Sequence, residues 1–139
     1  MTSSNPAPGF QKHPNYEVTL QPISDTMTVE VNGTEVARST RAVQLLETKH
    51  RAVWYMPLDA VDQTVIEQTD TQTYCPFKGY ASYWRINAGG QTVDDAIWAY
   101  MDPYDECLPV KGYASFYTNK VDLKINGELM NKDGPGWVA

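Results

Sequence analysis

The dipeptide Asn32-Gly33 separates two short segments, residues 26–31 and 34–37, in which apolar and polar side chains alternate. Alternation with a period of two is typical of a strand that buries one face. Asn-Gly supplies the positive φ angles that a type I′ turn needs at both central residues. The pattern therefore predicts a β-hairpin, and it favours antiparallel sheets in a chain that continues in the same way.

More segments of strand character follow, separated by turn residues. They cover residues 42–46, 52–56, 71–75, 80–86, 92–101, 110–117 and 121–125. Only one segment resembles a helix: Leu58, Val61, Val65 and Ile66 recur at helical spacing, with the acidic Asp59 near the start, where it suits the helix dipole. The sequence therefore predicts a mainly β fold of packed antiparallel sheets with one short helix.

The length of 139 residues suits a single small domain. We expect this domain to cover residues 13–126, between a flexible N-terminal arm (residues 1–12) and a C-terminal tail (residues 127–139). The start of the chain carries no secretory signal, so a cytoplasmic location is expected. The two cysteines, Cys75 and Cys107, are then interpreted as reduced thiols.

Composition excludes several classes of protein. Nine tyrosines and four tryptophans are too many for a disordered chain. A net charge of −6 with only 11 basic residues argues against a nucleic-acid partner, which requires a basic surface. No apolar run is long enough to cross a membrane, so no membrane partner is expected. The composition indicates a soluble, acidic, aromatic-rich domain.

The pentapeptide Lys-Gly-Tyr-Ala-Ser occurs twice, at residues 78–82 and 111–115, and each copy is followed by two aromatic residues. Two copies are too few to stack as a solenoid. We interpret them as two equivalent strands of one sheet system. Alternation then places Ala81 with Tyr83, and Ala114 with Phe116, on one face of their strands. The alternative is that both copies only fill a β core.

These elements together resemble one known family. The resemblance is carried by the ordered set Val31-Asn32-Gly33, Val36-Ala37-x-Ser39, Glu47, Trp54-Tyr55-Met56-Pro57, Asp59, Thr73-x-Cys75-Pro76-Phe77-Lys78-Gly79, Ala81-x-Tyr83-Trp84, Ala96-x-Trp98-x-Tyr100 and Phe116-Tyr117. The chain resembles the domain-of-unknown-function family four-two-seven, sometimes labelled nucleotidyltransferase-like, from about His13 to Val121.

The resemblance implies a β-tent-like fold, akin to methionine sulfoxide reductase B and Mss4-like proteins. Several relatives of that class hold zinc with paired Cys-x-x-Cys motifs, which this sequence lacks, so no metal is expected. The resemblance implies no established activity. A nucleotidyltransferase would need a Gly-Ser loop with paired metal-binding carboxylates, and the chain contains no Gly-Ser. Function must therefore be argued from candidate sites.

The segment Cys75-Pro76-Phe77-Lys78-Gly79 is the first candidate site. Pro76 restricts its own φ angle, and Gly79 permits a conformation or close approach that a Cβ would block. A turn that carries a thiol and an ammonium group suits an anion, and Lys78 would favour the thiolate of Cys75 as a nucleophile. The alternative is that Cys75 is a small buried residue and Lys78 a surface charge.

Glu47 is the second candidate, because it ends an apolar strand. There we expect partial desolvation to raise the pKa of its carboxyl group toward the range of a general acid or base. The alternative is a strand-end charge in water or paired with a nearby arginine. Arg38 and Ser39 follow the first hairpin and offer donors to a carboxylate or phosphate. His13 and His50 are interpreted as solvent-exposed.

Aromatic residues on the predicted strands are the third signal. We expect Trp54, Tyr55, Tyr83, Trp98 and Tyr100 to line an apolar cleft in which a few polar groups orient a ligand. The competing use of such residues is a protein interface, here that of a homodimer.

These candidates predict a small-molecule-binding domain, and as one form of it a cofactor-independent acid–base enzyme of the isomerase or lyase type. Glu47 would transfer protons, while Lys78 and Arg38 would bind an anionic or carbonyl group of the ligand. No flavin or nicotinamide loop is visible, so no cofactor is expected. Two alternatives stay open: a non-catalytic binding or homo-oligomer assembly module, and a thiol oxidoreductase that uses Cys75 with Cys107 as the resolving thiol.

Overall fold

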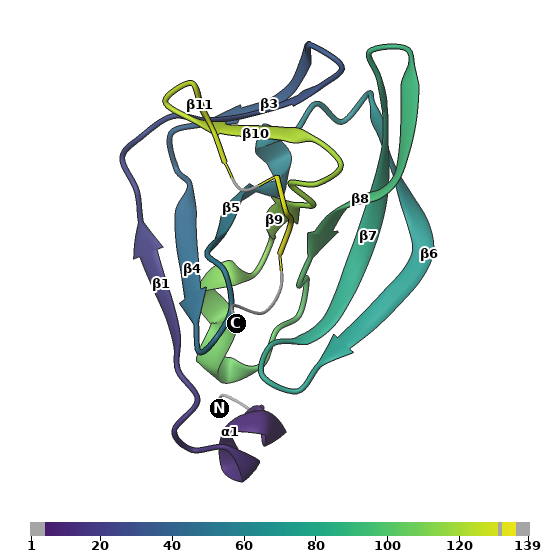
Figure 1. Cartoon of the computed structure of the whole chain (residues 1–139). Coiled ribbons are helices and arrows are strands. Elements are labelled where there is room, and N and C mark those ends of the chain that lie inside the picture. Colours follow the sequence, from purple (N-terminus) through teal and green to yellow (C-terminus); the bar gives the residue numbers. More distant parts are fainter. Residues whose placement is uncertain (1–4, 131, 136–139) are drawn as a thin grey trace.

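Two antiparallel sheets form the domain, which was analysed as a computed structural model that describes residues 5–130 and 132–135 (Figure 1). The elements are α1 (Pro8–Lys12), β1 (Val18–Pro22), β2 (Met27–Val31), β3 (Thr34–Ser39), β4 (Val43–Glu47), β5 (Val53–Pro57), the 3₁₀ turn η1 (Leu58–Ala60), β6 (Ile66–Cys75), β7 (Gly79–Ala88), β8 (Gln91–Ala99), the 3₁₀ segment η2 (Asp105–Val110), β9 (Tyr113–Phe116), β10 (Asp122–Ile125) and β11 (Glu128–Leu129).

The larger sheet has seven strands in the order β1-β4-β5-β9-β8-β7-β6, and the smaller has four in the order β11-β10-β2-β3. The four-stranded sheet lies across one end of the seven-stranded sheet, and α1 lies at the opposite end (Figure 1). The prediction of a mainly β, single small domain with two antiparallel sheets is therefore confirmed.

The predicted hairpin forms between β2 and β3. Val31 pairs with Thr34, and Asn32 and Gly33 have φ angles of 49° and 82°, as a type I′ turn requires. The alternating residues Met27, Val29 and Val31 are all buried.

The predicted helix after residue 57 is wrong. Only the 3₁₀ turn η1 forms there, and Ile66 already begins β6. Asp62 explains the break, because its carboxylate accepts hydrogen bonds from both the backbone N–H and the hydroxyl of Thr64. This side-chain turn replaces the helical hydrogen bonds that the spacing of the apolar residues suggests.

The α-helix of the structure, α1, instead lies within residues 1–12, which we interpreted as an arm. The Gly9 N–H donates to the Pro76 carbonyl at 2.9 Å, and a Cβ on Gly9 would stand 2.7 Å from the Phe77 ring. Phe10 meets the same ring edge-on, with the ring centres 5.0 Å apart. The described part of this segment therefore packs on the turn between β6 and β7.

The seven-stranded sheet has two different faces, because successive residues of a strand point to opposite sides. Its sheet-packing face, which includes Met56, Ile86, Ile97 and Phe116, joins the core shared with the four-stranded sheet. Its cavity face carries a second cluster, which includes Leu45, Tyr55, Tyr83, Trp98 and Tyr100 and packs against η2.

The two Lys-Gly-Tyr-Ala-Ser copies form β7 and β9, on either side of β8 in this sheet. Alternation within each copy is confirmed, yet the copies present opposite faces. Trp98 pairs with Tyr83 on one side and with Ser115 on the other, so the copies are offset by one residue. An offset of one residue reverses the face. Tyr83 therefore lies on the cavity face, whereas Phe116 lies on the sheet-packing face.

Candidate functional site

A row of paired residues crosses the cavity face. Tyr55 pairs with Ser115, Ser115 with Trp98, and Trp98 with Tyr83, so side chains from β5, β9, β8 and β7 lie next to each other on one side. A cavity of about 340 Å³ opens over this row. Six residues that the sequence predicted for a site line it: Glu47, Tyr55, Lys78, Tyr83, Trp98 and Tyr100.

The aromatic walls carry their polar groups in defined positions. The Trp98 indole N–H donates to the Tyr55 hydroxyl at 3.1 Å, and the two rings meet edge-on. The Tyr83 hydroxyl lies 2.9 Å from Thr73 Oγ1. Within the described part of the chain, the Tyr100 hydroxyl has no hydrogen-bond partner, although the residue is only 8% exposed. Burial raises the pKa of Tyr55 and of Tyr100, so both hydroxyls keep their protons at neutral pH.

A buried ion pair contributes charge to the cavity lining. Glu47 ends β4, and Lys78 lies in the turn between β6 and β7. The Lys78 ammonium donates to both carboxylate oxygens, at 2.9 and 3.0 Å, and the two side chains are only 6% and 9% exposed. The turn depends on Gly79, whose φ of 115° is strained for any residue with a side chain. The local sequence thus directs Lys78 inward.

The expected raised pKa of Glu47 is wrong. Burial alone would raise the pKa, but the charge and hydrogen bonds of Lys78, the hydrogen bond from Tyr16 and the nearby His50 together outweigh burial, and the pKa is lowered. Glu47 is therefore a stable carboxylate at neutral pH. The alternative of a strand-end charge in water, or paired with an arginine, is also wrong, because its ion-pair partner is Lys78.

Sequence reasoning missed two polar residues beside this pair. The Tyr16 hydroxyl donates to Glu47 Oε2 at 2.5 Å. Burial, and to a lesser degree this hydrogen bond, raises the pKa of Tyr16. His50 is half-buried rather than exposed, and its Nδ1 lies 2.9 Å from the Thr48 carbonyl oxygen. Tyr16 precedes β1 in a segment without periodicity, so no pattern in the sequence pointed to it.

Two other lining residues went unrecognised. Tyr117 follows β9, and its hydroxyl lies 3.3 Å from that of Tyr83. Pro135, among the described C-terminal residues, also lines the cavity, and the neighbouring Gly134 carbonyl accepts a hydrogen bond from Arg51. The second pentapeptide copy was a usable signal for Tyr117, since this residue is the second of the two aromatic residues that follow it.

Three predicted ligand-binding residues lie elsewhere. Arg38 and Ser39 belong to β3 of the four-stranded sheet, where Arg38 pairs with Glu35 at 2.7 Å. The hydroxyl of Ser39 accepts a hydrogen bond from the backbone N–H of Arg41. Trp54 precedes Tyr55, so its side chain takes the opposite face and packs against the shared core. The prediction that these residues surround one ligand with Lys78 and Glu47 is therefore wrong.

The cysteines differ in their surroundings. Cys75 Sγ lies 3.9 Å from the Lys78 ammonium nitrogen. Cys107 is fully buried, its thiol faces the Phe77 carbonyl oxygen at 3.6 Å, and burial raises its pKa to about 11. A thiol with this pKa is almost entirely protonated at neutral pH, which makes Cys107 a poor resolving thiol.

Two further features of the described residues concern metals and membranes. Among residues 5–130 and 132–135, no three His, Cys, Asp or Glu side chains are grouped so that they could hold a metal ion. Among the same residues, no helix has both the length and the apolar character that a membrane-spanning helix needs.

Comparison with known proteins gives one finding. The model of a family described as a domain of unknown function (DUF427), named NTP_transf_9, matches residues 19–127. This range includes both sheets apart from Val18 and β11, together with every cavity-lining residue named above except Pro135; Tyr16, which contacts Glu47, lies outside it. No curated protein matches the chain.

Proposed function

Because the chain belongs to the DUF427 family, whose description states no activity, we propose its function from the cavity itself. The chain is a small-molecule-binding domain, and its ligand is a planar, uncharged molecule with a carbonyl group. The observation that carries this proposal is the closed Lys78–Glu47 pair in an aromatic cavity that Tyr100 also lines, with a hydroxyl that has no hydrogen-bond partner among the described residues.

The ion pair favours an uncharged ligand. The positive charge of Lys78 is balanced by Glu47 at 2.9 Å, so an anionic ligand would have to compete with a buried carboxylate. An ammonium group has three donors, and two of them serve Glu47. Among the described residues, the third has only the weakly accepting sulfur of Cys75, at 3.9 Å. A neutral carbonyl oxygen is a better acceptor for that donor and leaves the ion pair intact.

The aromatic walls favour a planar ligand. Trp98 and the tyrosines of the row supply flat apolar surfaces, which pack well against another ring. The Tyr100 hydroxyl supplies one more donor or acceptor without having to give up a partner within the described residues. Binding pockets commonly combine apolar walls with a few polar groups, and a volume of about 340 Å³ suits a small molecule.

Neither acid–base catalysis nor assembly through these aromatics fits as well. A carboxyl group with a lowered pKa is a weak base near neutral pH and has no proton to donate. Tyr55, Tyr83, Trp98 and Tyr100 are each at most 8% exposed within a single chain. They are therefore recessed in the cavity, where they offer little exposed area to an interface between subunits.

Three probes of similar size test the proposal: benzamide, which is neutral and has a carbonyl, benzoate and benzylamine. We expect benzamide to shift the NMR signal of the Trp98 indole N–H saturably, and benzoate and benzylamine to leave this signal unchanged. Tyr100→Phe removes one hydrogen-bonding group and should weaken benzamide binding about fivefold. Arg38→Gln is the matched control, because Arg38 does not line the cavity, and it should bind benzamide as the unmodified chain does.

The proposal fails if benzamide produces no saturable shift at Trp98. It also fails if benzoate or benzylamine binds there as tightly as benzamide, or if Tyr100→Phe and Arg38→Gln have equal effects.

A further inference from the structure

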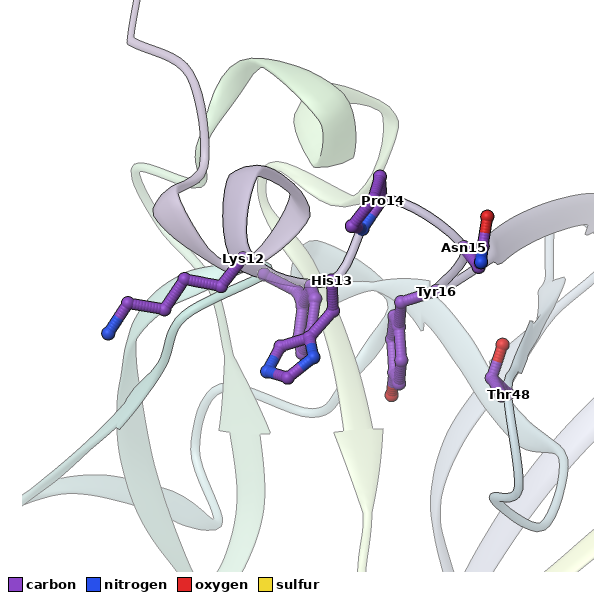
Figure 2. A pocket seen from close by; sticks show the side chains of 7 residues that line it. Lys12, His13, Pro14, Asn15, Tyr16 and Thr48 are labelled. Atoms are coloured by element: carbon purple, nitrogen blue, oxygen red, sulfur yellow. The ribbon is translucent and has the colours of Figure 1, made fainter.

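A second pocket lies outside the cavity, beside the loop that joins α1 to β1. Its volume is about 520 Å³, and its lining includes Lys12, His13, Tyr16, Thr48 and Phe77. In Figure 2, His13 and Tyr16 point to the same side of the loop, and Lys12 extends outward from the end of α1. We call this the outer pocket, because none of its lining residues lines the cavity.

The outer pocket and the cavity are separated by a thin wall. The Tyr16 ring stacks on Phe77, with ring centres 3.9 Å apart and planes 12° from parallel, while the Tyr16 hydroxyl reaches Glu47. Phe77 and Thr48 face the outer pocket, and their chain neighbours Lys78 and Glu47 line the cavity. Since both polar and aromatic contacts hold this wall in place, the two spaces are separate sites.

The charges of the outer pocket are opposite to those of the chain as a whole. The protein carries a net charge of −6, which disfavours anions in general, and basic groups that are locally free of carboxylates offset this repulsion. Lys12 and His13 both line the pocket and, within the described part of the chain, form no ion pair. No Asp or Glu is among the described lining residues. Within residues 5–130 and 132–135, nothing therefore neutralises the Lys12 ammonium at the rim of the pocket.

We propose that the outer pocket is a second binding site, for a planar aromatic molecule that carries a carboxylate. The ring of the ligand packs against the stacked rings of Tyr16 and Phe77, which offer a flat apolar surface. The carboxylate meets the Lys12 ammonium and the imidazole of His13, both of which can donate hydrogen bonds to it. The proposed ligand of the cavity, with its closed ion pair, is instead neutral.

The probe for this site is 2-naphthoate, compared with its neutral analogue 2-naphthamide. We expect 2-naphthoate to shift the backbone amide signals of Phe77 and Thr48 saturably, without shifting the Trp98 indole signal. The double variant Lys12→Met/His13→Gln should weaken 2-naphthoate binding about fivefold, the size expected when exposed charged contacts are lost. Both residues are exposed, so the fold should persist. Lys111→Met is the matched control, since this exposed lysine does not line the outer pocket.

Three results would overturn the second site. The first is the absence of a saturable shift at Phe77 and Thr48. The second is an equal affinity of 2-naphthamide and 2-naphthoate in titrations followed at Phe77 and Thr48, because the carboxylate would then contribute nothing to binding in the outer pocket. The third is an equal effect of the double variant and of Lys111→Met. Shifts caused by benzamide at Trp98 report on the cavity alone, so either site can fail without the other.

Discussion

The two faces of the seven-stranded sheet belong to the same strands but carry different kinds of side chain. On β8, Ile97 and Ala99 point into the core shared with the four-stranded sheet, while Trp98 and the residue just after the strand, Tyr100, point to the cavity. The sheet-packing face is mainly aliphatic and largely buried. The cavity face is mainly aromatic, and its side chains bring hydroxyl and indole groups that need partners.

Because of this difference, neighbouring residues of one strand have different roles: those on one face stabilise the fold, and those on the other line the proposed binding site. Aliphatic residues stabilise the fold in proportion to the apolar area they bury, and they leave no polar group to satisfy. The cavity face instead keeps a charged pair, Lys78 and Glu47, beside an open volume. Tyr100 lines the same volume, and its hydroxyl has no hydrogen-bond partner within the part of the chain that the structure describes. Substitutions on the first face should therefore reduce stability, whereas conservative substitutions on the second should mainly change binding.

The largest effect is expected from Phe116→Ala, compared with Ser115→Ala at the adjacent position. Phe116 is 1% exposed on the sheet-packing face, and its truncation should lower the free energy of unfolding by about 3–5 kcal/mol. Ser115 lies on the other face, where its hydroxyl donates to the Trp54 carbonyl at 2.7 Å. Loss of that hydrogen bond should cost about 1 kcal/mol. Urea unfolding of both variants measures the difference, and equal losses would contradict the division between the faces.

A somewhat smaller loss of stability is expected from Lys78→Met. The variant leaves the Glu47 carboxylate buried with Tyr16 as its remaining close donor, and it should lower the free energy of unfolding by about 3 kcal/mol. The double variant Lys78→Met/Glu47→Leu removes both charges and should recover most of this loss. Urea unfolding again supplies the measurement. If the double variant is less stable than Lys78→Met, the ion pair is not the source of the effect.

Most of the fold could be predicted because its determinants are local. Alternation in residues 26–31 and the turn at Asn32-Gly33 act within a few residues, so the hairpin is legible in the sequence. The helix prediction was wrong although it also rested on a local pattern, the spacing of Leu58, Val61 and Val65. A second local interaction, the side-chain turn at Asp62, competes with the helix. Hydrophobic spacing alone does not reveal that competition.

The site was only partly predictable, because its chemistry depends on distant contacts. Glu47 and Lys78 stood out as unusual residues, yet their pairing joins positions 31 residues apart. That contact, together with those of Tyr16 and His50, reverses the expected direction of the Glu47 pKa shift. Arg38 lies closer to Glu47 along the chain but belongs to the other sheet. Proximity in sequence was therefore a poor guide to which charges meet.

The smallest expected effect is on the pH dependence of the free energy of unfolding. It tests the contribution of one residue of the cavity face, Glu47. The folded-state pKa of Glu47 is below its value in the unfolded chain. Such a group stabilises the fold above the unfolded pKa, about 4.3, and this stabilisation is lost as the pH falls through the folded pKa. The free energy of unfolding should therefore decline as the pH falls from 5 to 3, and Glu47→Gln should make the decline shallower.

The matched control for this experiment is Glu35→Gln. Glu35 also has a lowered pKa, caused by its hydrogen bond to Arg38, but that pair is exposed on the four-stranded sheet, where solvent screens it. Urea unfolding at intervals between pH 7 and pH 3 should show a larger change of slope for Glu47→Gln than for Glu35→Gln. Curves for Glu47→Gln that run parallel to those of the unmodified chain would mean that Lys78 does not hold Glu47 in its ionised form. That result would contradict the closed ion pair, and with it the argument that the cavity prefers a neutral ligand.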